Sequence, residues 1–182
     1  MSIWSRLGFG SVDVERPTSA AERDTVRRIV DELDHLSLER ARYVATFAFV
    51  LSRVAHADLQ ITAEETRAME RIVVEHGRLP EEQALIVVQM AKTQSLLFGG
   101  TDNYSVTKEF ARIAAREDKL ALLRCLFAVS AADRSITSVE STVIRQIADE
   151  LGLEHAEFIA VRSGFREHLA VLRDDRTPPA GE

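Results

Sequence analysis

Two pairs of carboxylates occur at the same spacing in two parts of the chain. Asp58 and Glu65 lie in the stretch VAHADLQITAEET, and Asp133 and Glu140 lie in the stretch SAADRSITSVEST. In both stretches the aspartate follows an apolar run and the glutamate comes seven residues later. Carboxylate oxygens are preferred ligands of Ca²⁺ and other hard divalent cations. The four side chains are therefore candidate ligands of a metal site.

The same residues also suit the corners between two helices without any metal. Thr62-Ala-Glu-Glu65 and Thr137-Ser-Val-Glu140 both fit the capping box, in which threonine and glutamate each accept the other's backbone amide. Each aspartate can accept the amides that follow it in an Asx-type turn. Helix capping and metal binding are thus two open interpretations. An EF-hand is excluded, because its glutamate belongs at position 12 and stands here at position 8.

The elements that carry these corners are expected to be helices. Apolar residues recur at spacings of three and four along most of the chain, which is typical of amphipathic helices. The expected helices cover residues 20–34, 37–57, 62–77, 80–95, 105–116, 117–132 and 137–152, with a last one marked by apolar residues from 158 to 172. Residues 96–104 form the one clear internal loop of this prediction.

The two corners belong to an internal repeat. Residues 51–77 align with residues 126–152 without a gap and share ten identities in 27 positions. The identities fall at core positions, at the turn, at the cap and at the closing glycines, Gly77 and Gly152. We predict a duplicated helix–turn–helix hairpin, whose two copies pack about a pseudo-twofold axis into one core.

Length and composition agree with a single helical domain. The chain has 182 residues, of which 46% are hydrophobic and 29% are charged, and it has only 8 glycines and 4 prolines. This favours an all-α fold over a sandwich or barrel, which needs more turns. We predict a single-domain bundle of about seven to eight helices over residues 19–172. Residues 1–18 are expected to be a flexible segment, and residues 173–182 a disordered tail.

Charge and motifs narrow the classes of function. A net charge of −6 argues against a general nucleic-acid binder. The single cysteine, Cys125, excludes an internal disulfide and a multi-cysteine zinc site, and is expected to be a buried apolar residue. The five histidines form no zincin motif, and no nucleophile elbow occurs. The residues therefore favour a protein that is not an enzyme.

Location is inferred from apolar segments. No apolar run reaches the length of a transmembrane span, and the first residues lack the apolar core of a signal peptide. We therefore expect a cytoplasmic protein. Residues 3–9 contain Ile3, Trp4, Leu7 and Phe9. They either fold back onto the domain or make a peripheral contact with a membrane or a partner.

The repeated sequence motifs resemble those of the tellurite-resistance TerB-like family, and in particular of its uncharacterised bacterial branch. The resemblance is carried by FVLSRVAHADLQITAEE, TDNYSVTKEFAR and DKLALLRCLFAVSAADRSITSVESTVIRQIADELGL, and it covers roughly residues 35–170. It implies an all-helical, single-domain cytoplasmic protein of bacteria, linked to tellurite resistance or to stress handling. Family members commonly have glycine after each aspartate, where this chain has Leu59 and Arg134.

The resemblance also implies a mode of action. Members of the family are regarded as interaction modules, with a metal-binding role suggested for acidic residues that correspond to Asp58, Glu65, Asp133 and Glu140. We therefore expect a non-enzymatic module that binds a protein partner or a second copy of itself. Ca²⁺ or another divalent cation is the candidate ligand of its acidic turns. The alternative is a metal-dependent, hydrolase-like enzyme that uses the same four residues.

Overall fold

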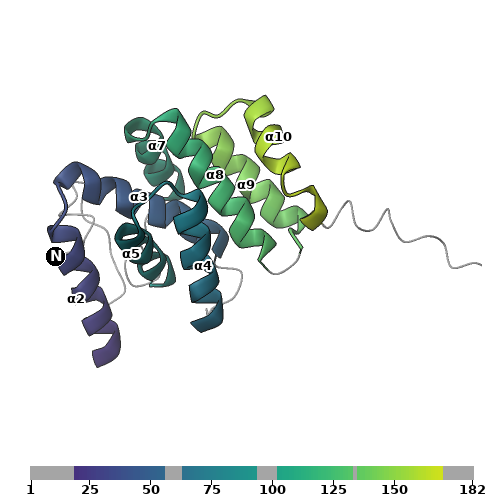
Figure 1. The fold of residues 1–182 in the computed structure, drawn as a ribbon. Coiled ribbons are helices and arrows are strands. Elements are labelled where there is room, and N and C mark those ends of the chain that lie inside the picture. The colour runs from purple at the N-terminus through teal and green to yellow at the C-terminus, as the bar shows by residue number, and fades with distance from the viewer. Residues whose placement is uncertain (1–18, 56–62, 94–101, 133–134, 170–182) are drawn as a thin grey trace, which may run out of the picture.

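The structure, a computed structural model, describes residues 19–55, 63–93, 102–132 and 135–169. These residues form eight α-helices and one short 3₁₀ helix (Figure 1). The helices are α2 (Ala20–Asp34), α3 (Leu38–Ala55), α4 (Ala63–His76), α5 (Glu81–Lys92), α7 (Asn103–Ile113), α8 (Arg116–Ala131), α9 (Ser138–Glu150), α10 (His155–Ser163) and η1 (Arg166–His168). In this part of the chain the only β-type contact is one isolated bridge between Ile136 and Leu169. The predicted all-α fold is confirmed.

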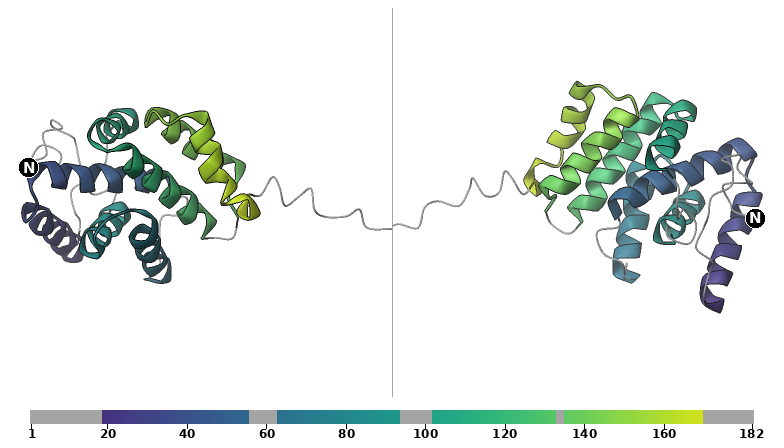
Figure 2. Two further views of the ribbon diagram at one scale, coloured as in Figure 1. Left: turned by 45° about the horizontal axis from the view of Figure 1, so that its top comes forward. Right: turned by 180° about the vertical axis from the view of Figure 1, so that it is seen from behind.

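Helices α3 and α8 form the centre of the bundle. Helix α3 packs against α5, α7, α8 and α9, and α8 packs against α4, α9 and α10. Both are apolar on most of their circumference, so that neighbours can cover them on several sides. The views in Figure 2 place α2 at one end of the bundle and α10 at the other.

Aromatic side chains fill the core at two places. The ring of Phe110 on α7 lies 5.3 Å from the ring of Tyr43 and 5.8 Å from that of Phe47, which both belong to α3. Further along the bundle, Phe127 of α8 stacks on Phe165 with ring centroids 5.6 Å apart. Burial raises the pKa of the Tyr43 hydroxyl well above its usual range, because the phenolate would lose its hydration. The first cluster fixes α7 against α3.

The helix starts agree with the internal repeat, although its two closing glycines serve different needs. Helix α4 begins at Ala63 and α9 begins at Ser138, which are equivalent positions in the alignment. Gly152 has a φ of 73°, in the left-handed region that favours glycine. A Cβ at Gly77 would instead lie 2.4 Å from the carbonyl oxygen of Val73. One glycine is required by backbone conformation and the other by space.

Replacing Gly152 with alanine is expected to lower the free energy of unfolding by about 1 kcal/mol, because an L-residue is strained at positive φ. Urea denaturation of the two proteins measures the difference. Gly164→Ala is the comparison at a φ of −65°, where the added Cβ would lie 3.3 Å from the carbonyl oxygen of Val161, while a Cβ at Gly152 has no atom within 4 Å. An equal loss in both variants would show that the left-handed conformation is not the cause.

The structure corrects four predicted helix boundaries, one of which is the end of the helix expected over 105–116, which lies at Ile113. The helix expected to start at Ser105 begins at Asn103, because Asp102 supplies its N-cap. Helix α5 ends at Lys92 instead of near 95. The last helix ends at Ser163 instead of near 172: the amides of Gly164 and Phe165 bond to carbonyls three residues back, which tightens the chain into a turn. Leu169 is then extended and pairs with Ile136.

Candidate functional site

The structure describes two of the four predicted metal ligands. Glu65 lies in the first turn of α4, and Glu140 lies in the first turn of α9. Asp58 and Asp133 fall outside the described residues, so the convergence of the four carboxylates remains a prediction. Within the described ranges, no group of three or more histidine, cysteine, aspartate or glutamate side chains could hold a metal ion.

Glu140 forms the capping box that the sequence predicts. Its Oε2 accepts the backbone N–H of Thr137 at 2.8 Å and the Thr137 hydroxyl at 2.7 Å. In return, the Glu140 amide donates to Thr137 Oγ1 at 3.2 Å. Such a cap contributes about 1 kcal/mol, and the carboxylate also faces the positive end of the helix dipole. In the second copy of the corner, capping is therefore the role that these contacts give Glu140.

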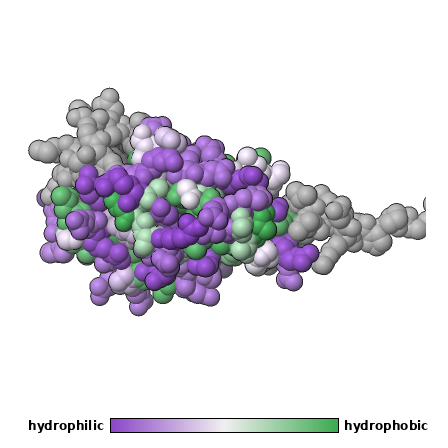
Figure 3. Space-filling model, turned by 90° about the horizontal axis from the view of Figure 1, so that it is seen from above, coloured by the Kyte–Doolittle hydropathy of each residue, from purple (hydrophilic) through white to green (hydrophobic). Residues whose placement is uncertain are grey.

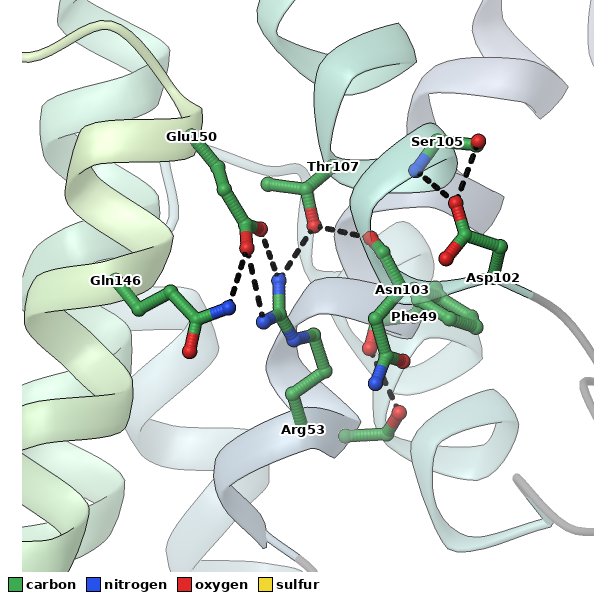
Figure 4. A network of polar contacts seen from close by, with 9 residues as sticks. Phe49, Arg53, Asp102, Asn103, Ser105, Thr107, Gln146 and Glu150 are labelled. Carbon is green, nitrogen blue, oxygen red and sulfur yellow. Dashed lines mark hydrogen bonds and ion pairs between the residues drawn. The ribbon is translucent and has the colours of Figure 1, made fainter.

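A polar pocket lies between the two hairpins, and none of its lining residues is one of the four predicted metal ligands. It is open to solvent, has a volume of about 530 Å³, and is formed by α3, α9 and the start of α7 (Figure 4). Its lining residues are Ser52, Arg53, Asp102, Asn103, Tyr104, Val143, Gln146 and Glu150. The pocket is within the size range of small-ligand sites in proteins.

A buried ion pair forms the floor of this pocket. Arg53 Nη1 donates to Glu150 Oε2, and Nη2 donates to Glu150 Oε1 at 3.3 Å. The side chains are only 8% and 7% exposed. Arg53 Nη1 also donates to the hydroxyl of Thr107 at 2.7 Å, and Gln146 Nε2 donates to Glu150 Oε1 at 2.9 Å. Since burial of a charge is costly unless it is paired and hydrogen-bonded, this network holds α3, α7 and α9 in one arrangement.

Asp102 lies at the mouth of the pocket and caps α7. Its Oδ2 accepts the Ser105 hydroxyl at 2.6 Å and the Ser105 amide at 2.9 Å. These hydrogen bonds, the hydroxyl first, hold the pKa of the Asp102 carboxyl below its usual range, and the positive charge of Arg53 acts in the same direction. Asp102 is consequently a carboxylate at neutral pH.

The charges that line the pocket sum to −1. Arg53 and Glu150 cancel, which leaves the carboxylate of Asp102. The N-terminus of α7 would ordinarily attract an anion, but Asp102 occupies that position with its own charge. The electrostatics of the pocket therefore oppose an anionic ligand.

The sequence prediction missed this pocket, although it contained one signal. Arg53 is the single charged residue in the apolar stretch VATFAFVLSRVA, and a charge in a buried helix requires a partner. The repeat alignment pairs Glu75 with Glu150 and so treats them as equivalent. In the structure Glu75 is exposed and Glu150 is buried against Arg53. Only the packing of α3 against α9 reveals that difference.

Cys125 has the character of a core residue, as predicted, and not that of a nucleophile. It is fully buried in α8, and burial raises the pKa of its thiol to about 12. The thiolate, which is the reactive form of cysteine, is therefore disfavoured in the folded protein.

The raised pKa of Cys125 predicts a loss of stability at alkaline pH. Above pH 9 the unfolded chain releases the thiol proton while the folded chain keeps it. The contribution of Cys125 to the free energy of unfolding is therefore fully present below about pH 9 and is lost as the pH rises toward 12. The slope approaches about 1.4 kcal/mol per pH unit only above about pH 10, so the expected loss between pH 8 and pH 10 is about 1.4 kcal/mol in total. Urea denaturation between pH 8 and pH 10 measures it. Cys125→Ala should reduce the dependence of the free energy of unfolding on pH, whatever its effect on stability at pH 8. An unchanged pH dependence would show that the Cys125 thiol is not its cause.

The fold and the pocket define a small all-α protein with a polar site between two helical hairpins. The chain belongs to the TerB family: residues 43–163, about two thirds of its length, match the family described as tellurite resistance protein TerB. No curated protein and no solved structure matches the chain. None of the helices in the described ranges combines the length and apolar character needed to cross a bilayer.

Proposed function

We propose that the chain is a non-enzymatic TerB module that contributes to tellurite resistance or a related stress response by binding a protein partner. The observation that carries this proposal is the pocket beside Tyr104, whose side chain is 57% exposed at the pocket rim. Tyrosines next to a well-formed pocket are common anchors of protein interfaces. Figure 3 shows one face of the molecule, where hydrophilic residues predominate and apolar ones are scattered between them.

The chemistry of the pocket supports binding over catalysis. A general acid or base at neutral pH needs a pKa near 7, whereas hydrogen bonds shift the pKa of Asp102 downward. Arg53 and Glu150 are hydrogen-bonded to each other and to Thr107 and Gln146. The groups that line the pocket thus stabilise its shape.

Complementation in the native host tests the proposal. A strain that lacks the gene should lose tolerance to tellurite, and the wild-type chain should restore it. Tyr104→Ala should restore it poorly and should capture less of the partner in cross-linking, while remaining folded. Val139→Ala, which also truncates an exposed apolar side chain, is the matched control. Unchanged tolerance in the deletion strain, together with no cross-linked partner, would contradict the proposal.

We also propose that the acidic corners bind a divalent cation, with Ca²⁺ as the first candidate. The proposal is supported by the two sequence motifs in which a glutamate follows an aspartate by seven residues, and by the preference of such cations for carboxylates. Calorimetric titration of Ca²⁺, Mg²⁺, Mn²⁺ and Zn²⁺ into the wild-type protein should give heat that is lost in Asp58→Asn/Asp133→Asn. The absence of heat with all four ions would rule out the cation site.

A further inference from the structure

We infer that the pocket between α3, α7 and α9 binds a basic side chain, arginine or lysine, presented by a segment of the partner protein. The inference rests on the proposed function and specifies where and what the module recognises. It is carried by the geometry of the pocket: a carboxylate at the mouth, amide side chains on the walls, an exposed aromatic ring at the rim and a neutralised ion pair at the floor.

The charge balance selects a cation. Glu150 neutralises the guanidinium of Arg53, and Thr107 accepts a further hydrogen bond from it. Among the lining residues, Asp102 carries the one charge without an ion-pair partner in the pocket, and it caps the α7 N-terminus. The chain as a whole has a net charge of −6, which also favours the approach of a basic partner.

The orientation of the polar side chains favours a hydrogen-bond donor. Gln146 directs Nε2 toward Glu150, and its carbonyl oxygen points away from that contact (Figure 4). The Ser105 amide and the Ser105 hydroxyl both donate to Oδ2 of the Asp102 carboxylate. Carboxylate and amide oxygens are acceptors, while a guanidinium offers five donors and an ammonium offers three, with no acceptor on either. A basic side chain therefore matches the acceptors that line this pocket.

The ring of Tyr104 provides a surface on which a cation can lie. The ammonium of Lys108 lies over this ring, 5.5 Å from its centroid, and both side chains are exposed. Cations are attracted to the face of an aromatic ring at such distances. A guanidinium that enters the pocket would displace the Lys108 ammonium from the face of the Tyr104 ring, and the lysine would be solvated by water instead. The planar guanidinium would then meet Asp102, two residues before Tyr104 in the chain.

Two matched peptides test the inference on the full-length protein. Acetyl-Gly-Arg-Gly-amide is titrated into ¹⁵N-labelled protein, with acetyl-Gly-Glu-Gly-amide as the control of opposite charge. The arginine peptide should shift the amide signals of Asn103, Tyr104 and Gln146 in a saturable manner, and the glutamate peptide should not. No saturable shift at these residues, or equal shifts with both peptides, would overturn the inference.

Two substitutions that change the charge of the pocket in opposite directions separate an effect on binding from an effect on folding. Asp102→Asn removes the charge yet keeps a good N-cap, and should weaken binding of the arginine peptide roughly two- to fivefold, the range of an exposed ion pair. Asn103→Asp adds a carboxylate at the pocket and should strengthen binding by a similar factor. Asp31→Asn on α2 makes the same charge change away from the pocket and should have no effect. Equal weakening by Asp102→Asn and Asp31→Asn would overturn the site.

A guanidinium chloride titration at low millimolar concentration identifies the source of the cation. Binding of guanidinium with no binding of the arginine peptide would mean that the pocket takes a free cation, which overturns recognition of a partner segment. A pocket that does not bind basic side chains can be distinguished from a protein that lacks the proposed function. Tellurite tolerance and partner cross-linking can persist through another surface when the peptide does not bind.

Discussion

Replacing Glu150 with alanine is expected to lower the free energy of unfolding by about 3–5 kcal/mol. The substitution leaves the guanidinium of Arg53, whose side chain is 8% exposed, without its counter-charge. Gln146 loses its acceptor at the same time. Most of the expected loss comes from the unpaired buried charge and not from the missing attraction. Urea denaturation, read as the change in midpoint at constant slope, measures it.

A double substitution tests that explanation. Arg53→Met/Glu150→Leu removes both charges and retains apolar volume, so its stability should equal or exceed that of the wild-type protein. If the double variant were as unstable as Glu150→Ala, the penalty would come from lost packing and not from an unpaired charge. A loss below about 1 kcal/mol in Glu150→Ala would show that water already solvates Arg53.

Helices were the most predictable part of this protein. Their apolar spacing is a local property of the sequence, so residues 20–34 were assigned as the structure has them. The capping box at Thr137 and Glu140 was predictable for the same reason, because its two partners lie three residues apart in the chain. The predicted start of α7, at Ser105, is two residues late, because the predicted loop runs to residue 104 whereas Asp102 caps the helix and Asn103 begins it.

The pocket was beyond sequence reasoning because its parts are distant in the chain. Arg53 and Glu150 are 97 residues apart, and Arg53 and Thr107 are 54 residues apart. Their contact depends on how α3, α7 and α9 pack, and local pattern carries no information about that. The repeat alignment also hid this contact, because a duplicated hairpin suggests that Glu75 and Glu150 are equivalent. In the structure, packing against α3 buries Glu150 against Arg53, whereas Glu75 is exposed. Pseudo-symmetry in sequence therefore did not extend to the site.

Replacing Phe110 with alanine is expected to lower the free energy of unfolding by about 3–5 kcal/mol, as for other fully buried phenylalanines. Phe110 is 0% exposed and lies against the rings of Tyr43 and Phe47 on α3. Truncation removes apolar contacts and leaves a cavity that a helical core closes only in part. It also removes an edge-to-face ring pair with Phe47, which contributes beyond the buried area. Thermal and urea denaturation both measure the loss.

The position of Phe110 gives this substitution a second expected effect, on the pocket. Helix α7 also carries Thr107, which accepts from Arg53, and it follows Asp102 at the pocket mouth. If Phe110 anchors α7 to α3, hydrogen exchange of the α7 amides should accelerate more than that of α8 in Phe110→Ala. Val139→Ala, at a side chain that is 71% exposed, should change stability by no more than about 0.5 kcal/mol. Uniform acceleration in α7 and α8 would mean that the core opens as one unit, and that Phe110 does not hold the pocket helix separately.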